Sequence, residues 1–377
     1  MKRSAWVLFI TAVLAAQPPS TPQVRSPEIE SDGRVTFRLL APQATDVTVR
    51  GEWMKANERT PLVKAENGVW SVTVAAVPPE LLSYTIYVHG VPVVDPRNPL
   101  IKPGVSSTTS LIDIPGPEVE FHALKQVPHG TVHVHWYWSK AVNKHRRVHI
   151  YTPPGYDAAK STRYPVLYLL HGAGDTDGEW VTVGRANRIL DNLIAAGKAK
   201  PMLIVMPDGH AAGPGMDAVM RGQNTKLFEQ DLMGEVIPLV EAGYKTAKGA
   251  ENRALAGLSM GGNQTMHIGF NNLPMFGSLA VFSSSAGFNE EMMKDFEKRF
   301  GPLMADADKV NRQLQLLWIG CGTADFLYKR SMATVEMLKN QNIRHVYRET
   351  EGAGHTWPLW RKYLAEVSAM LFRKAGS

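Results

Sequence analysis

One serine of the 377-residue chain has the neighbours that a nucleophilic serine requires. Residues 257–261 read Gly-Leu-Ser-Met-Gly, the pattern G-x-S-x-G, and the mostly apolar segment 253–256 before them predicts a buried strand. Residues 263–270 after them predict a helix. Two glycines allow the strand and the helix to meet in a tight turn. The pattern therefore predicts that Ser259 stands on that turn at a helix N-terminus, where developing negative charge is stabilised.

A nucleophilic serine also needs a general base and a carboxylate that orients the base. His355 lies in a glycine-flanked loop just before the last predicted helix, and Asp325 lies in the loop after the apolar strand 314–319. Ser259, Asp325 and His355 then follow one another in the order that is typical of α/β-hydrolases. Asp208 is a rival acid, but it precedes the nucleophile in the chain. The sequence thus predicts a triad of Ser259, Asp325 and His355.

Acyl transfer by a serine requires two backbone N–H groups that hold the oxyanion. Met260, the residue after the nucleophile, is expected to donate one of them. The second is expected from the loop after strand 165–170, which reads His-Gly-Ala-Gly over residues 171–174. Ala173 is the predicted donor, and Gly172 is predicted to shape the turn beside the substrate.

The elements that position these residues alternate between strand and helix from residue 164 onward. Strands are expected at 165–170, 202–206, 253–256, 279–282, 314–319 and 345–349, and helices at 185–196, 228–244, 260–270, 290–300, 328–340 and 357–372. Such alternation predicts a parallel sheet covered on both faces, with the site at the carboxyl ends of its strands. Residues 118–377 are therefore expected to form an α/β-hydrolase domain. Within it, the glycine-rich stretch 208–225 is interpreted as a loop that forms a rim or lid, with a mobile insertion as the alternative.

Residues 28–115 carry short alternating strands and no helical period, which predicts an immunoglobulin-like β-sandwich. Trp70 is expected in its core, whereas Trp53 is open between a core position and a platform for a sugar ring. In the following strand, His133 and His135 have a spacing that suits a metal. No third ligand stands nearby in the sequence, so a solvated strand face is the preferred interpretation and no metal is expected.

The first residues predict export of the chain. Lys2 and Arg3 precede a short apolar run, so residues 1–16 are interpreted as a signal peptide and 17–27 as a flexible linker. The run is too short to span a bilayer, and a secreted or periplasmic protein without a membrane partner is expected. The formal charge of +6 does not suggest nucleic acid, and a single cysteine, Cys321, excludes an intramolecular disulfide.

Two parts of the sequence resemble known families. The front part resembles carbohydrate-binding module family 48, on residues 35–42, 51–53, 68–70 and 95–96. That resemblance implies an early-set sandwich and, where its surface aromatic residues are present, binding of α-glucans. The rest resembles carbohydrate esterase family 1, on residues 171–180, 184–187, 256–262, 322–327 and 354–360. Bacterial members of this group also pair such a sandwich with the esterase domain.

The second resemblance implies specific roles. Ser259 would be the nucleophile, Asp325 the acid and His355 the base, and no cofactor is implied. The family includes feruloyl esterases, which hold a phenolic ring in an apolar cleft beside the oxyanion loop. Trp180, Phe326 and Trp357 are the candidates for that cleft, with burial in the core as the alternative for each.

The expected function is that of a secreted serine esterase that cleaves feruloyl esters from plant cell-wall xylan, with the polysaccharide or its feruloylated fragments as partner. Four alternatives stay open: an acetylxylan esterase, a polyester esterase, a siderophore esterase and a carbohydrate-binding protein without activity. An anionic siderophore would need a basic rim, for which Arg185 and Arg221 are the candidates. The presence of all three triad residues argues against the last alternative, a carbohydrate-binding protein without activity.

Overall fold

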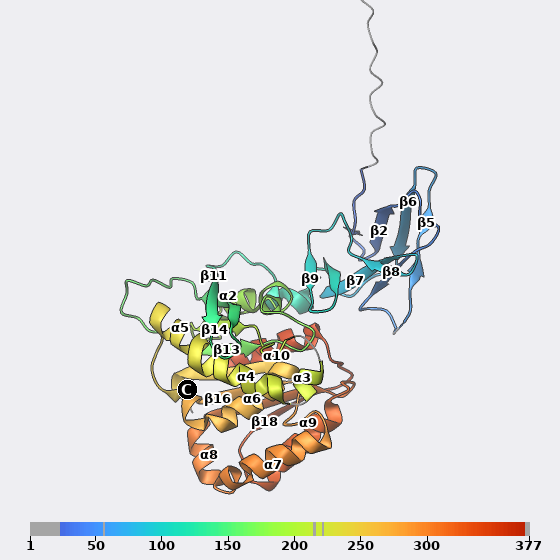
Figure 1. Cartoon of the computed structure of the whole chain (residues 1–377). Helices are drawn as coiled ribbons and strands as arrows, with labels where there is room; N and C mark the ends of the chain where they lie inside the picture. The colour runs from blue at the N-terminus through green and yellow to red at the C-terminus, as the bar shows by residue number, and fades with distance from the viewer. Residues whose placement is uncertain (1–22, 56, 214–215, 221, 374–377) are drawn as a thin grey trace, which may run out of the picture.

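The computed structural model describes residues 23–55, 57–213, 216–220 and 222–373 (Figure 1). The predicted signal peptide and the first part of the predicted linker lie outside these residues. Among the described residues, no helix is both long enough and apolar enough to cross a membrane.

Residues from Glu28 to Asp113 contribute two antiparallel sheets that pack against each other as a sandwich, as predicted. One sheet has the order β1-β2-β6-β5, and the other has the order β4-β3-β7-β10-β9 with β8 paired to β7. The strands of the sandwich are β1 (Glu28–Ile29), β2 (Val35–Leu40), β3 (Val47–Gly51), β4 (Thr60–Pro61), β5 (Val63–Lys64), β6 (Val69–Val74), β7 (Leu81–Val88), β8 (Val91–Val93), β9 (Ile101–Pro103) and β10 (Thr108–Asp113). Trp70 is buried in the sandwich core, as expected. Trp53 is half-buried and stacks on Phe37 with ring centroids 6.0 Å apart, which supports a core position.

The rest of the chain is built on an eight-stranded sheet of order β11-β12-β14-β13-β15-β16-β17-β18. The strands are β11 (Thr131–Ser139), β12 (Lys144–Thr152), β13 (Val166–Leu170), β14 (Leu203–Pro207), β15 (Arg253–Leu258), β16 (Ser278–Phe282), β17 (Leu316–Gly322) and β18 (Val346–Thr350). The hairpin β11–β12 pairs antiparallel with β14, and the strands from β14 to β18 run parallel. Their side chains are almost all buried from β13 to β17, because helices cover both faces of the sheet. The α/β-hydrolase fold predicted from the alternating pattern is confirmed.

The helices divide between the two faces of the sheet. They are η1 (Pro117–His122), α1 (Glu179–Thr182), α2 (Ala186–Ala195), α3 (Met216–Met220), α4 (Gln223–Asp231), η2 (Leu232–Val236), α5 (Ile237–Gly243), η3 (Ala250–Asn252), α6 (Met260–Asn271), η4 (Leu273–Met275), α7 (Glu290–Met304), α8 (Ala307–Gln313), α9 (Tyr328–Asn340) and α10 (Trp357–Met370). The pair α2 and α10 packs on one face, and α4 to α9 contribute to the core on the other.

Two sequence predictions on the second face need correction. The helix expected over 228–244 is interrupted by the π-helical turn η2, which ends two residues before Pro238. Proline lacks the N–H that would donate to Gly234 in a regular helix, so the hydrogen-bond ladder has to change at this point. The stretch 208–225 is also no continuous loop, since it contains α3 and the first turn of α4.

A buried ionic network joins the sandwich to the face of the sheet that carries α2 and α10. Glu80, just before β7, contacts Arg361 of α10 at 2.8 Å and His122 of η1 at 3.1 Å. Arg185, just before α2, pairs with Asp113 of the sandwich and contacts His122. Arg185 is therefore buried between the two domains, and its expected place on a basic rim is wrong. The other rim candidate, Arg221, lies outside the described residues.

The Glu80 carboxylate should make the junction between the domains sensitive to acid. Burial alone would raise the pKa of Glu80, but the hydrogen bond from His122 and the charge of Arg361 lower it from an ordinary 4.5 to about 2. Because the folded pKa is the lower one, this carboxylate stabilises the fold above pH 4.5, and the contribution disappears as the pH falls toward 2. Linkage predicts a loss of about 2 kcal/mol between pH 5 and pH 3. Urea unfolding of the wild type should show this loss in excess of Glu80→Gln, and equal losses in both proteins would contradict it.

Candidate active site

The chain reverses direction sharply at the predicted nucleophile. The strand β15 ends at Leu258, α6 begins at Met260, and Ser259 between them has φ 51° and ψ −114°. A positive φ is strained for a serine and is typical of functional turns. A Cβ on Gly257 would lie 2.4 Å from the carbonyl carbon of Gly261, which belongs to the backbone and cannot move aside. The close approach of β15 and α6 therefore requires Gly257. Gly261 is required by a different contact, since a Cβ there would lie 2.7 Å from the carbonyl oxygens of Leu170 and His171 at the end of β13.

His355 and Asp325 meet in the loops that follow β18 and β17. The Nδ1 atom of His355 lies 3.0 Å and 2.9 Å from the two carboxylate oxygens of Asp325. Asp325 Oδ1 also accepts from the N–H of Leu327 at 2.8 Å. Burial alone would raise the pKa of Asp325, but the hydrogen bond and the charge of His355 hold it below its usual value. The carboxylate thus stays ionised at neutral pH and occupies Nδ1, which leaves Nε2 to exchange a proton.

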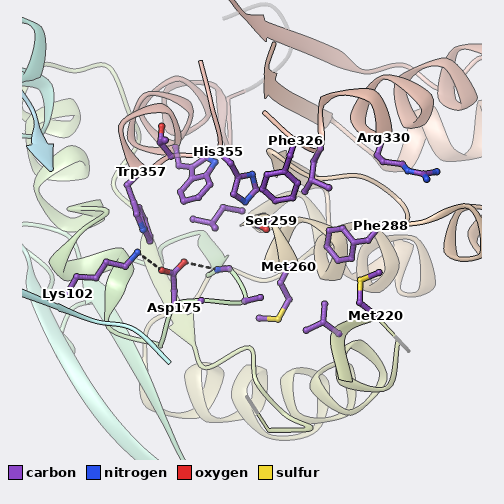
Figure 2. A pocket seen from close by; sticks show the side chains of 18 of the residues that line it. Lys102, Asp175, Met220, Ser259, Met260, Phe288, Phe326, Arg330, His355 and Trp357 are labelled. Atoms are coloured by element: carbon purple, nitrogen blue, oxygen red, sulfur yellow. Dashed lines mark hydrogen bonds and ion pairs between the residues drawn. The ribbon is translucent and has the colours of Figure 1, made fainter. Parts of the chain in front are cut away.

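Ser259 and His355 line one cavity of about 580 Å³ at the carboxyl ends of the parallel strands. Figure 2 shows the rings of His355 and Phe326 beside each other, with Ser259 close to them. The structure therefore brings the three predicted triad residues together from three separate loops. The rival acid, Asp208, lies instead 3.5 Å from Nε2 of His171 and has no contact with His355 among the described residues.

The predicted oxyanion donors lie on the same cavity. Ala173 and Met260 both line it, and the N–H of Gly261 donates to the carbonyl of His171 at 3.1 Å, which holds the two segments together. The N–H of Gly172 is used by Asp175 Oδ2 at 3.3 Å. Within the described part of the chain, no acceptor contacts the N–H of Ala173 or of Met260. These two groups are therefore available to an oxyanion.

The three aromatic candidates for the substrate cleft have different positions. Phe326 is 75% exposed on the cavity and its ring lies 4.5 Å from that of His355. Trp357 lines the cavity wall. Trp180 is only 1% exposed and is not among the lining residues, so its predicted contact with substrate is wrong. Its indole N–H donates to the carbonyl of Leu170. Its ring packs edge-on against that of Trp357, with the ring centroids 5.0 Å apart.

Sequence reasoning missed several residues that line the cavity. They are Glu52, Lys102, Val219, Met220, Phe288, Arg330 and Trp360. Val219 and Met220 belong to α3, within the stretch 208–225 that was interpreted as a rim or lid, although neither residue was singled out. Glu52 and Lys102 come from the sandwich, and no local motif marks either of them.

The histidine pair of β11 lies away from this cavity. His135 Nε2 contacts the hydroxyl of Tyr244 at 2.6 Å, and the ring of His133 also packs on Tyr244. Across the described residues, no group of three or more His, Cys, Asp or Glu side chains is placed to hold a metal ion.

The parallel sheet and the serine turn at its carboxyl edge define an α/β-hydrolase. The Esterase family model matches residues 139–371, and the model for carbohydrate-binding module 48, the isoamylase N-terminal domain, matches residues 24–101. The chain therefore belongs to the esterase family, with a module-48 sandwich in front. Both resemblances noted in the sequence are confirmed.

Curated relatives include esterases with named substrates. An endo-1,4-β-xylanase/feruloyl esterase of Xylanibacter ruminicola is 31% identical over 94% of this chain and 47% of its own length. An acetyl esterase of Caldicellulosiruptor saccharolyticus is 22% identical over 55% of this chain and 83% of its own length. The chain thus spans about half the length of the xylanase/feruloyl esterase that it matches.

Solved structures show the same architecture. A CE1 ferulic acid esterase from Anaeromyces mucronatus, in complex with ferulic acid, has 25% identity and a TM-score of 0.57, covering 67% of this chain and 95% of its own. The enterobactin esterase of Shigella flexneri has 19% identity and a TM-score of 0.63, covering 90% of this chain and 92% of its own. The second likeness extends over both domains but supports the fold alone.

Proposed function

We propose that this chain is a secreted serine esterase that hydrolyses feruloyl esters of plant cell-wall xylan. One observation carries the proposal: a serine turn and a carboxylate-oriented histidine open on one cavity that also holds aromatic side chains. The names of the xylanase/feruloyl esterase relative and of the ferulic acid esterase structure support the choice of acyl group.

The residues act in a fixed order. Ser259 Oγ attacks the ester carbonyl while His355 Nε2 takes the hydroxyl proton, and the charge of Asp325 stabilises the imidazolium. The N–H groups of Met260 and Ala173 hold the oxyanion of the tetrahedral intermediate. His355 then gives its proton to the departing sugar oxygen, which leaves an acyl-serine. Water, deprotonated by His355, attacks this acyl group and releases the free acid and Ser259.

The cavity walls favour an aromatic acyl group. Phe288, Phe326, Trp357 and Trp360 give it apolar walls, and its volume of about 580 Å³ lies in the range of small-molecule sites. A phenolic ring can stack on Phe326 at the entrance, while the sugar side of the ester extends toward Glu52 and Lys102 of the sandwich. Export to a secreted or periplasmic location, where such polysaccharides occur, is part of this proposal.

The alternatives have weaker support in the structure. An acetyl ester would fill little of this cavity. The acetyl esterase relative is nevertheless a reason to test that acyl group. The argument for an anionic siderophore rested on a basic rim of Arg185 and Arg221. Arg185 is buried at the domain junction instead, and Arg221 lies outside the described residues. The decisive comparison offers the purified protein methyl ferulate, acetylated xylan and p-nitrophenyl acetate. Turnover of the acetyl substrates alone would replace the feruloyl assignment, and no turnover of any ester would favour a carbohydrate-binding protein.

The ring of Phe326 provides a sharper test of the acyl group. Phe326→Ala should raise KM for methyl ferulate about tenfold, because an aromatic pair and its buried area contribute about 1.5 kcal/mol. The same variant should change kcat/KM for p-nitrophenyl acetate by less than about threefold, since an acetyl group does not reach the ring. This second substrate is the internal control for damage to His355, which the ring touches. Equal losses on both substrates would show that Phe326 positions His355 rather than the acyl group.

A further inference from the structure

The sandwich contacts the oxyanion loop through the segment that follows β9. The N–H of Val105 donates to the carbonyl of Gly174 at 3.0 Å. One residue earlier, the backbones approach so closely that a Cβ on Gly104 would lie 2.9 Å from the same carbonyl oxygen. This segment and the loop over residues 171–175 are therefore closely packed against each other, and this contact between the two domains lies directly beside the cavity.

Lys102 of β9 adds a charge to this contact. Its Nζ atom lies 3.1 Å from Oδ1 of Asp175 and 5.7 Å from the ring centre of Trp357 (Figure 2). The Asp175 side chain is nearly buried. Among the described residues, its ion-pair partner is Lys102. Without this partner, Asp175 would hold an uncompensated charge next to the active site.

Asp175 connects the ion pair to the oxyanion loop. Its other oxygen, Oδ2, accepts from the N–H of Gly172 at 3.3 Å. Gly172 directly precedes Ala173, whose N–H has no acceptor among the described residues. The chain of contacts from Lys102 to Asp175 to Gly172 thus ends one peptide unit away from a predicted oxyanion donor.

We propose that Lys102 is a positioning residue, through which the sandwich fixes the oxyanion loop in the geometry that the reaction needs. This inference rests on the oxyanion role of Ala173 in the proposed function. It assigns the sandwich a part in the chemical step itself, which applies to every ester, whether or not it carries a sugar. Displacement of a catalytic group by about 1 Å costs about a hundredfold in rate.

The test uses p-nitrophenyl acetate, which has no sugar for the sandwich to bind. In the full-length chain, Lys102→Met should lower kcat ten- to a hundredfold while KM changes less than about threefold. Lys102→Arg keeps the positive charge and should recover at least half of the lost activity on a logarithmic scale. The matched control is Lys64→Met, because the Lys64 ammonium donates to two carbonyls of the sandwich itself, those of Pro42 and Ala44. This control should leave kcat unchanged.

A double-mutant cycle tests whether Lys102 acts through Asp175. If it does, Lys102→Met should have little further effect on kcat in an Asp175→Asn background. Full kcat in Lys102→Met, or an effect that adds completely to that of Asp175→Asn, would overturn the proposal. An equal loss in Lys64→Met would also overturn it, by showing a general effect of the sandwich. Absence of turnover in the wild type would instead refute the proposed function, so the two failures are distinguishable.

Discussion

Ser259→Ala is expected to lower kcat/KM for p-nitrophenyl acetate by about 10⁵-fold, the size of effect seen when a triad nucleophile is removed. The reason is that this hydroxyl stands on a strained turn at the carboxyl edge of the sheet, beside a histidine that is held by a carboxylate. Initial rates over a range of substrate concentrations measure the loss directly.

A second serine controls for the substitution itself. Ser161 is exposed in the loop before β13, and Ser161→Ala should keep full activity. Urea unfolding should give Ser259→Ala a stability close to that of the wild type, because alanine and serine meet the same constraint at φ 51°. A residual activity above about one per cent of the wild type would mean that another group is the nucleophile.

Arg361→Met is expected to cost the largest amount of stability, about 3–5 kcal/mol, because it leaves a buried carboxylate without its cation. The Arg361 guanidinium is fully buried, contacts Glu80 at 2.8 Å and donates to the carbonyls of Leu81 and Val183. Methionine has a comparable length but supplies none of these hydrogen bonds. Urea unfolding at pH 7, followed by tryptophan fluorescence, measures the difference in free energy of unfolding.

The partner of Arg361 supplies the control for this prediction. In the double variant Arg361→Met with Glu80→Gln, the carboxylate charge is gone, so part of the lost stability should return. If the double variant is destabilised by the sum of the two single effects, the ion pair does not couple the domains. A loss below about 1 kcal/mol in Arg361→Met alone would show that the junction is stabilised mainly by other contacts.

The arrangement of the candidate triad could be predicted from the sequence because its determinants are local. The G-x-S-x-G pattern fixes its own turn through two glycines, and in a parallel sheet the loops after successive strands meet at one edge. Asp325 follows β17, which its apolar residues make recognisable, and His355 follows the more polar β18 in a glycine-flanked loop. The structure places the two side chains in contact. Their roles in catalysis follow from this arrangement and stay predictions until activity is measured.

The residues that were missed depend on contacts between distant parts of the chain. Trp180 has the type and place of a substrate platform, but a carbonyl on β13 takes its indole N–H and holds the ring inside. Lys102 reaches the cavity because the sandwich docks on the second domain through long-range contacts, such as that of Glu80 with Arg361, which are 281 positions apart. No periodicity or motif encodes such a docking, so the sandwich side of the site could not be predicted from the sequence.

The most direct test of the central claim is covalent labelling with phenylmethylsulfonyl fluoride, located by peptide mass spectrometry. If Ser259 is activated by His355 and Asp325, the wild type gains one adduct on the peptide that contains Ser259. The same reaction should be slowed at least a hundredfold in His355→Ala, which lacks the proton acceptor. An adduct on another serine, or equally fast labelling of the two proteins, would contradict the account.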